Sequence, residues 1–109
     1  MMTQLLDDLR ALDALFSDES KWTKYALARD DAGTPNVTIH DPDAVCWCLE
    51  GGIGKAVNGA RRADDVRHRI SNACEIPNYV AWNDSHWRTF PDVKALIARA
   101  IATEEGRVT

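Results

Sequence analysis

Apolar residues recur at helical spacing along much of this chain of 109 residues, and this periodicity constrains the fold more than any other feature. The first such stretch covers residues 3–17, and its apolar positions are Leu5, Leu9, Leu12 and Phe16. Intervals of three and four residues place these side chains on one face of a helix, with most of the neighbouring aspartates elsewhere. Thr3 precedes the stretch at a position typical of an N-cap.

Three more stretches have the same period, and we expect helices at residues 42–58, at residues 61–74 and from near Thr89 onward. Asp41 and Pro42 are suited to the N-cap and the first position of the second helix. Gly106 is expected to end the last helix, because glycine often follows the final helical turn.

A short β-hairpin is expected between the first and second helices. Residues 24–29 and 36–40 flank the segment DDAGTP, in which Gly33 and Pro35 are typical turn residues. Val37 and Ile39 alternate with polar residues, as in a strand with one buried face. The sequence therefore predicts a mainly α protein of about four helices with a small β-hairpin. We expect a single compact α+β domain over residues 1–109.

The composition indicates a water-soluble protein. Hydrophobic residues make up 45% of the chain and charged residues 28%, which suits one core with an ordinary polar surface. No apolar run approaches the roughly 18 residues of a membrane span. The first ten residues contain aspartates where a secretory signal would be basic and apolar. We therefore expect a cytoplasmic protein that does not enter a membrane.

The charge is divided unevenly along the chain. Residues 1–50 contain 4 basic and 10 acidic side chains, whereas residues 51–109 contain 9 basic and 7 acidic ones. An acidic first half disfavours nucleic acid as a partner, because phosphate binding needs a basic surface. The basic run at residues 60–69 is interrupted by Asp64 and Asp65, so we interpret it as a solvated face and not as a binding patch.

The glycine-rich segment GGIGKA at residues 51–56 resembles a phosphate-binding loop but lacks its key residues. The pattern requires an earlier glycine, where this chain has Leu49, and Ser or Thr after the lysine, where it has Ala56. Gly51 and Gly54 are instead expected to let another backbone or ring approach the predicted helix closely. Trp47 lies on the same side, and we leave open whether it belongs to the core or to an interface.

No metal or cofactor is expected. The chain has three cysteines, an odd number that argues against a disulfide framework. If Cys46 and Cys48 lie on one helix, their side chains point about 200° apart and cannot bind one ion.

The segment AWNDSHWRTF at residues 81–90 contains the candidate binding residues Trp82, Asn83, Asp84, His86, Trp87 and Arg88. A structural interpretation competes with the binding one. Thr89 and Asp92 have the spacing of a capping box, and Asn83 and Asp84 favour turns. Arg88 is expected to bond to Asp84 and close the loop. No catalytic residue is expected, because Ser85 and His86 are adjacent and neighbouring residues seldom align for nucleophilic attack.

Two segments resemble a known family. Trp47-Cys48-x-x-Gly51 and Trp82-Asn83-Asp84-x-x-x-Arg88-Thr89-x-x-x-Val93 are similar to segments of small bacterial and phage proteins that form a family of unknown function. The resemblance extends from the first predicted helix to the last. Members often carry a small residue where this chain has Trp87, so Trp87 adds aromatic surface here. The resemblance implies no established activity; an accessory or inhibitory role would fit the size of the chain.

Three functional hypotheses remain. The leading one is noncatalytic binding of a protein partner through the Trp82–Arg88 segment, because Trp and Arg are enriched at interface hot spots. The alternative is a small-ligand pocket in which Trp82 and Trp87 stack on a ring and Asn83, Asp84 and Arg88 bind its polar edge. The third is an enzyme, for which no complete set of catalytic residues is visible. A concave pocket at Trp87 would favour a ligand, whereas an exposed patch would favour a protein.

Overall fold

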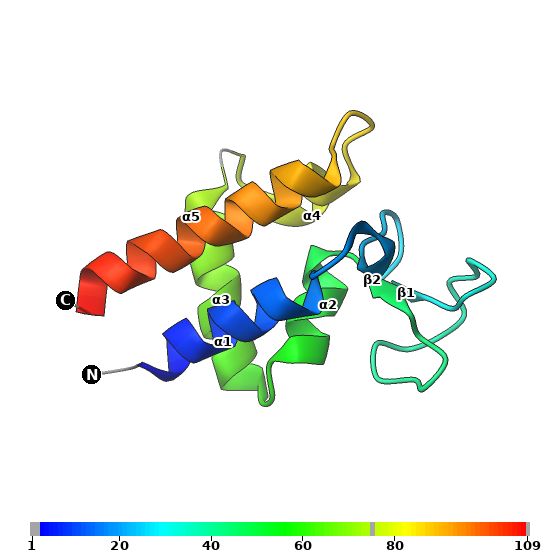
Figure 1. Ribbon diagram of the computed structural model, residues 1–109, viewed down its shortest axis with the longest axis horizontal. Helices are drawn as coiled ribbons and strands as arrows, with labels where there is room; N and C mark the ends of the chain where they lie inside the picture. The colour runs from blue at the N-terminus through cyan, green and yellow to red at the C-terminus, as the bar shows by residue number, and fades with distance from the viewer. Residues whose placement is uncertain (1–2, 75, 109) are drawn as a thin grey trace.

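Helices α1 (Gln4–Leu15) and α5 (Phe90–Val108) lie side by side and antiparallel in the computed structural model, which describes residues 3–74 and 76–108 (Figure 1). Helix α3 (Ala60–Ala73) packs across both of them, and α2 (Leu49–Ala56) packs against α1 and α3. The short helix α4 (Tyr79–Asp84) leads into α5. The described residues thus form a compact, mainly helical domain of five α-helices and a two-stranded sheet, which confirms the predicted fold class.

The sheet and its loops gather at one end of the helices, away from the two chain ends (Figure 1). Strand β1 (Ala28–Arg29) pairs antiparallel with β2 (Cys46–Trp47), with Ala28 opposite Trp47. The short 3-10 helix η1 (Glu19–Lys21) precedes Trp22, which forms an isolated bridge with Trp47. This end of the domain has few regular elements, so side-chain bonds must hold it in place.

The predicted apolar stripes of α1, α3 and α5 form the core. Its fully buried members include Leu9, Leu12, Phe16, Leu49, Ile53, Val66, Ile70, Val93, Leu96 and Ile97. The N–H of Leu6 donates to Thr3 Oγ1 at 3.1 Å, so the predicted N-cap of α1 is confirmed. None of the described helices combines the length and the apolar character needed to cross a membrane.

The predicted start of the second helix is wrong by several residues. Helix α2 begins at Leu49, with Cys48 as its N-cap, and not at Pro42. The carboxylate of Asp41 accepts the N–H of Asp43 at 2.8 Å and so closes a turn instead of capping a helix. The N–H of Val45 donates to the carbonyl of Arg29 at 2.9 Å, which draws the following residues into the sheet.

The predicted hairpin also has a different partner strand. Residues 36–40 form no strand, and β1 pairs with β2 instead. Asp30 closes the turn between the two segments by accepting the N–H and the hydroxyl of Thr34 at 2.9 and 2.7 Å. Gly106 does not end the last helix, because α5 continues to Val108.

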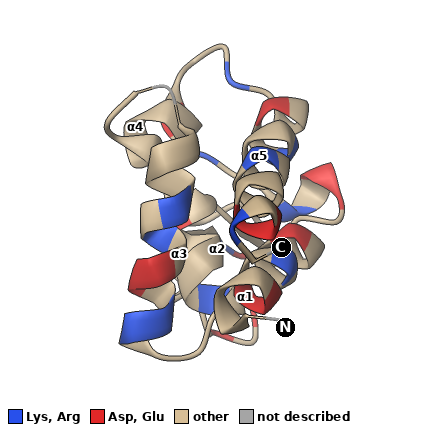
Figure 2. Cartoon of the chain, turned by 90° about the vertical axis from the view of Figure 1, so that its left-hand side faces the viewer, with Lys and Arg blue, Asp and Glu red and all other residues tan. Residues whose placement is uncertain are grey.

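The basic run at residues 60–69 is not simply solvated. Helix α3 carries alternating basic and acidic residues (Figure 2), and some of its arginines join neighbouring helices. Arg62 binds the buried Asp8 with two bonds of 2.6 and 3.0 Å, and Arg69 binds the buried Glu104 at 3.0 Å. These ion pairs connect α3 to α1 and to α5.

Candidate functional site

The side chain of Asn83 connects three segments at the loop end of the domain. Its oxygen accepts the indole N–H of Trp22 at 2.7 Å and the backbone N–H of Leu49 at 3.2 Å. Its nitrogen donates to the carbonyl of Thr23 at 3.2 Å and to the carboxylate of Asp84 at 2.9 Å. Asn83 is fully buried. It therefore fixes the segment after η1 and the start of α2 to the end of α4.

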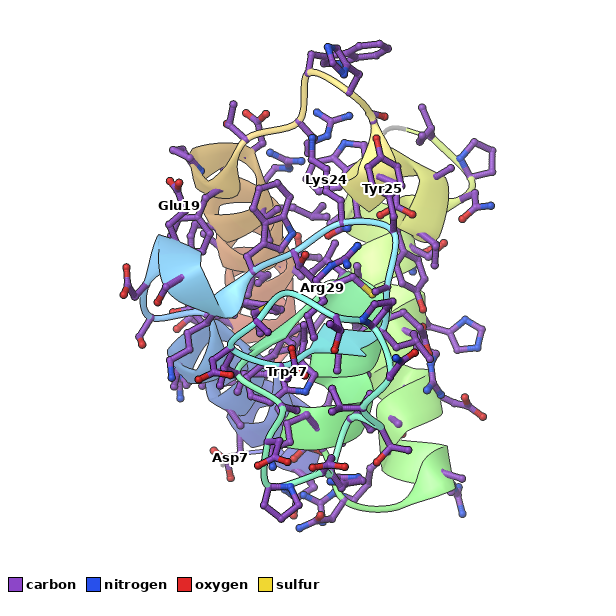
Figure 3. The ribbon with its side chains drawn as sticks, turned by 90° about the vertical axis from the view of Figure 1, so that its right-hand side faces the viewer. Asp7, Glu19, Lys24, Tyr25, Arg29 and Trp47 are labelled. Carbon is purple, nitrogen blue, oxygen red and sulfur yellow. The ribbon has the colours of Figure 1, made fainter. Side chains whose placement is uncertain are left out.

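Asp84 and Lys24 extend this connection to the surface. The carboxylate of Asp84 accepts the backbone N–H of Tyr25 at 2.9 Å, and Lys24 Nζ donates to the carbonyls of Ser85 and His86 at 2.6 and 3.2 Å. Lys24 and Tyr25 thus lie beside the loop that leaves α4 (Figure 3). Tyr25 has a φ of 68°, a left-handed conformation that a non-glycine residue adopts only when its surroundings enforce it.

Trp82 and Arg88 have a structural role. Trp82 is buried, and the guanidinium of Arg88 lies 3.9 Å from the centre of its ring. Arg88 Nε donates to the carbonyl of Trp82 at 2.9 Å, and its ion pair is with Asp92 at 3.8 Å. The expected bond between Arg88 and Asp84 is therefore not formed. The expected turn is also displaced, because Asp84 is the last residue of α4.

The capping box before α5 is present. The N–H of Thr89 donates to Asp92 Oδ2 at 3.0 Å, and the N–H of Asp92 donates to Thr89 Oγ1 at 3.4 Å. These reciprocal bonds are the ones predicted from the spacing. They anchor the C-terminal end of the loop that carries Trp87.

The candidate binding residues are consequently divided between interior and surface. Trp82 and Asn83 are inside, whereas His86 is exposed and Trp87 is 74% exposed. Trp82, with one face covered by Arg88, has little surface left for a ligand. The stacking of one ring between Trp82 and Trp87 is therefore not what this geometry provides.

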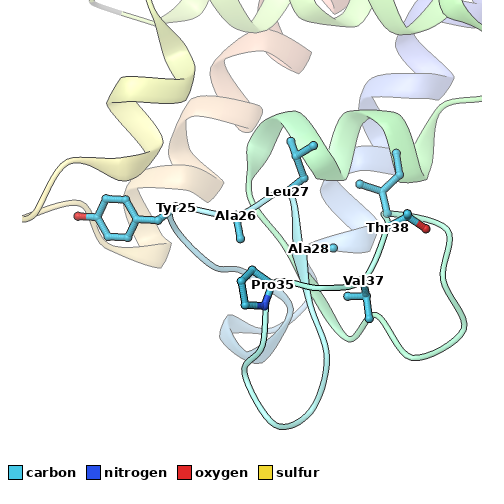
Figure 4. Close-up of a pocket in the computed structure, with 8 residues that line it drawn as sticks. Tyr25, Ala26, Leu27, Ala28, Pro35, Val37 and Thr38 are labelled. Atoms are coloured by element: carbon cyan, nitrogen blue, oxygen red, sulfur yellow. The ribbon is translucent and has the colours of Figure 1, made fainter.

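A groove that sequence reasoning missed lies beside Tyr25. Its volume is about 500 Å³, with residues 25–28 as one wall and residues 35 and 37–39 as the other (Figure 4). The lining is mainly apolar, and Leu27 is 55% exposed. Leu27 and Val37 are apolar in the sequence, but the alternation of residues 36–40 predicts a hairpin with a buried face and not an open groove.

Glycines of α2 allow both walls to lie close to this helix. A Cβ added at Gly51 would stand 1.9 Å from the carbonyl oxygen of Leu27, and one at Gly54 would stand 2.5 Å from Ile39 Cδ1. The expected close approach of another backbone is confirmed at Gly51. Trp47 is buried in the core, and its indole N–H donates to the carbonyl of Ile39 at 3.0 Å, which fixes the second wall. Of the two alternatives for Trp47, the core is therefore correct.

A second polar cluster connects α2, α3 and α4. The hydroxyl of Tyr79 donates to the carboxylate of Glu50, which also accepts Arg67 Nε at 2.9 Å. Arg67 binds Asp64 at 2.7 Å as well. Burial, followed by the bond to Glu50, raises the pKa of Tyr79 far above its usual value, so its phenol stays protonated. Because these groups are bonded to one another, the cluster works as a structural tie between helices.

The cysteines are not arranged as the sequence suggested. Cys46 lies in β2 and Cys48 is the N-cap of α2, so the two do not share a helix. The Sγ of Cys48 accepts the N–H of Gly51 at 3.3 Å, and burial raises the pKa of this thiol. Within residues 3–74 and 76–108, no group of three or more His, Cys, Asp or Glu side chains is placed to hold a metal ion.

Several residues that carry the family resemblance, among them Trp47, Gly51, Asn83 and Arg88, build this end of the domain by the contacts described above. Neither the curated proteins nor the solved structures yielded a match to the chain. A model of a family of unknown function, DUF6197, matches residues 1–103, and the chain belongs to this family.

Proposed function

We propose that this chain is a noncatalytic binding protein whose loop end docks onto a protein partner. We call this surface the loop face and define it as residues 25–28, 35–39 and 85–88. The observation that carries the proposal is the exposure of large apolar side chains there: Tyr25 is 66%, Leu27 55% and Trp87 74% exposed. Exposed aromatic residues in a defined patch are typical anchors of protein interfaces.

The rigidity of the loop face supports this function. The carboxylate of Asp84 accepts the backbone N–H of Tyr25. Lys24 donates to the carbonyls of Ser85 and His86, the two residues before Trp87. A surface that is already ordered loses less conformational entropy when a partner binds. The bonds of Asn83 and Asp84 thus prepare the surface without contacting the partner themselves.

The polar residues near the loop do not form a nucleophile–base pair. Ser85 Oγ donates to the carbonyl of Ala81 at 3.1 Å, and His86 is an exposed residue of the loop. Nucleophilic catalysis requires a base within hydrogen-bond reach of the attacking oxygen. This arrangement supports binding in preference to catalysis. By its size and family resemblance, the chain suits an accessory or inhibitory role in a bacterium or phage.

The groove supports a second candidate function, the binding of a small apolar ligand. Its volume of about 500 Å³ lies in the usual range for small-molecule sites. In that case the residues of the walls, and not Trp87, would determine affinity. The two functions therefore differ in the effect of a substitution at Trp87.

Site-specific photo-crosslinking tests the proposal. A photoreactive phenylalanine analogue is placed at Leu27, at Trp87 and, as control, at Ala102, which is exposed in the C-terminal part of α5. We expect the same protein to be crosslinked from positions 27 and 87, but not from 102, in the cells that produce the chain. The purified partner should bind Trp87→Ala at least about tenfold more weakly, as for a hot-spot residue.

Wild-type affinity of both Trp87→Ala and Leu27→Ala for that partner would overturn the proposal. A crosslinking pattern that is the same at all three positions would overturn it as well. A small molecule that copurifies with the wild type, and is lost from groove variants only, would establish the second candidate function instead.

A further inference from the structure

The backbone in the walls of the groove has hydrogen-bonding groups that the domain itself does not use. The N–H groups of Ala26, Leu27, Val37 and Thr38 make no hydrogen bond with another described residue. No backbone hydrogen bond joins residues 25–28 to residues 35–39 across the groove in the part of the chain that the structure describes. Both mainly apolar walls of the groove therefore carry backbone N–H groups that are free to bond a ligand.

Such a combination suits an extended peptide better than a purely apolar molecule. A peptide inserted between two chain segments can satisfy backbone donors and acceptors on each side, while alternate side chains enter apolar pockets. A small hydrocarbon ligand would leave the same donors unbonded. Unsatisfied donors that become buried cost about 1–3 kcal/mol each, which disfavours the apolar ligand.

The charges next to the groove indicate the sign of the charge that a partner would carry. Asp30 and Asp31 follow shortly after the first wall, and Asp41 and Asp43 follow the second. None of these four carboxylates takes part in an ion pair with a described residue. By contrast, the buried carboxylates at the helical end, such as Asp8, are paired with arginine.

The basic groups nearby are already bound to uncharged oxygens. Arg29 donates to the hydroxyl of Thr23 and to the carbonyls of Gly33 and Lys24 at 2.9–3.0 Å. Lys24 donates to the carbonyls of the loop after α4. Hydrogen bonds from Thr34, its hydroxyl first, lower the pKa of Asp30, so this carboxylate stays ionised at neutral pH. Lys24 and Arg29 keep their positive charges, but the four carboxylates outnumber these two cations, so the balance of these six groups is negative.

We propose that the groove binds an extended segment of a partner protein in which apolar side chains are flanked by lysine or arginine. The apolar walls hold the alternate side chains, the free N–H groups bond the peptide backbone, and Asp30, Asp31, Asp41 and Asp43 attract the flanking charges. This inference rests on the proposed function, because it names the class of partner for part of the loop face.

A pair of synthetic peptides tests the proposal directly. The probe is Lys-Lys-Val-Leu-Val-Leu-Lys-Lys, and its matched control carries Glu at every Lys position. Binding is followed by the backbone amide resonances of the isotope-labelled full chain. We expect the basic peptide to shift the amides of Ala26, Leu27, Val37 and Thr38 and to bind at least about tenfold more tightly than the acidic one at low salt. This preference should shrink in high salt, as for exposed charges.

Variants of the chain separate charge from shape. Asp31→Lys and Asp43→Lys should each lower the affinity for the basic peptide by about threefold or more. Asp65→Lys, at an exposed position of α3, should leave this affinity unchanged. Ala26→Trp should fill the groove and abolish binding, and an unchanged circular dichroism spectrum shows that the variant is folded. Wild-type affinity of Ala26→Trp would overturn the proposal.

Equal affinity for the two peptides, or shifts confined to other parts of the chain, would also overturn it. Octanol serves as the small apolar probe, and shifts of the wall amides by octanol but not by the peptides would decide against a peptide. In each of these cases, persistent crosslinks from position 87 to one protein would leave the proposed function intact. That function itself is refuted by loss of the crosslinks from both 27 and 87, by identical crosslinking at all three positions, or by wild-type affinity of both Trp87→Ala and Leu27→Ala.

Discussion

The indole N–H of Trp22 donates to the side-chain oxygen of Asn83 at 2.7 Å, although 61 positions separate the two residues in the sequence. The same oxygen accepts the N–H of Leu49 at 3.2 Å, at the first residue of α2. One carboxamide thus joins η1, α2 and α4 at the point from which the loop face extends. The Trp-Asn-Asp segment therefore supports the loop face mainly from within.

Asn83→Ala is expected to destabilise the domain strongly. The substitution removes the acceptor of the buried N–H of Leu49 and of the partly buried indole N–H of Trp22. Each unsatisfied buried donor costs about 1–3 kcal/mol, so the free energy of unfolding should fall by about 2–5 kcal/mol in urea denaturation. Asn72→Ala, at an exposed position of α3, is the control and should change it by less than about 0.5 kcal/mol. Similar values for both variants would contradict the central role of Asn83.

The parts of the fold that could be predicted from the sequence depend on local periodicity. The helices α1, α3 and α5 have an apolar stripe, and Thr3 and the pair Thr89 and Asp92 supply caps within four residues of the groups they bond. Such contacts are specified by neighbours in the sequence, so pattern and spacing are sufficient.

The remaining parts depend on partners that are distant in the sequence. Asn83 and Asp84 are typical turn residues, but their bonds to Trp22 and Tyr25 override that local preference. Val45 joins the sheet because its N–H reaches Arg29, and no local pattern shows this. The groove was missed for a related reason, since an apolar residue such as Leu27 looks the same in a sequence whether it is buried or lines an open surface.

Gly51→Ala should disrupt the contact between α2 and the first wall of the groove. The new methyl group would lie 1.9 Å from the carbonyl oxygen of Leu27. The nearest atoms all belong to the backbone of Leu27, which cannot move aside as the end of a flexible side chain can. We expect a loss of about 2–4 kcal/mol in the free energy of unfolding, in the range of severe overpacking. Gly106→Ala is the matched control, because it also lies in a helix but its Cβ would meet no atom within 4 Å. It should stabilise the domain by about 0.5–1 kcal/mol.

The capping box should make stability depend on pH through Asp92. The hydrogen bond from the N–H of Thr89 lowers the pKa of Asp92 in the folded state. A lowered folded-state pKa stabilises the domain above the unfolded value of about 4, and this contribution is lost as the pH falls through the folded value. The melting temperature of Asp92→Asn should therefore lie below that of the wild type at pH 7, and the difference should shrink toward pH 3. A difference that is constant over this range would argue against the bond.

Tyr79 should ionise only in strongly alkaline solution. Burial and the bond to Glu50 raise its pKa, so the folded state holds this proton more tightly than the unfolded state does. The corresponding stabilisation is complete below the unfolded value of about 10 and is lost as the pH rises further. The chain has two tyrosines, and a titration of the absorbance at 295 nm should show one late component. Tyr79→Phe should remove this component; its persistence in that variant would assign it to Tyr25.

Tyr25 and Trp87 are expected to contribute to partner binding without contributing to the stability of the domain. Trp87 is 74% exposed, so Trp87→Ala should change the free energy of unfolding by no more than about 0.5 kcal/mol. Tyr25 has a φ of 68°, which asparagine tolerates better, and Tyr25→Asn should stabilise the domain by about 0.5–1 kcal/mol. Tyr25→Val should do the reverse, because a β-branched residue is strained most in this conformation.

Both Tyr25→Asn and Trp87→Ala should nevertheless lower the affinity for the crosslinked partner, since each removes an exposed ring from the loop face. Denaturation and partner affinity measured on the same three variants test this together. If Trp87→Ala unfolds the domain, Trp87 belongs to the core, and the placement of the loop face is wrong. If Tyr25→Asn gains stability and keeps full affinity, the left-handed conformation is not maintained for the sake of the tyrosine ring. The stabilised variant that no longer binds is the expected result, because a strained residue persists where its side chain serves a function.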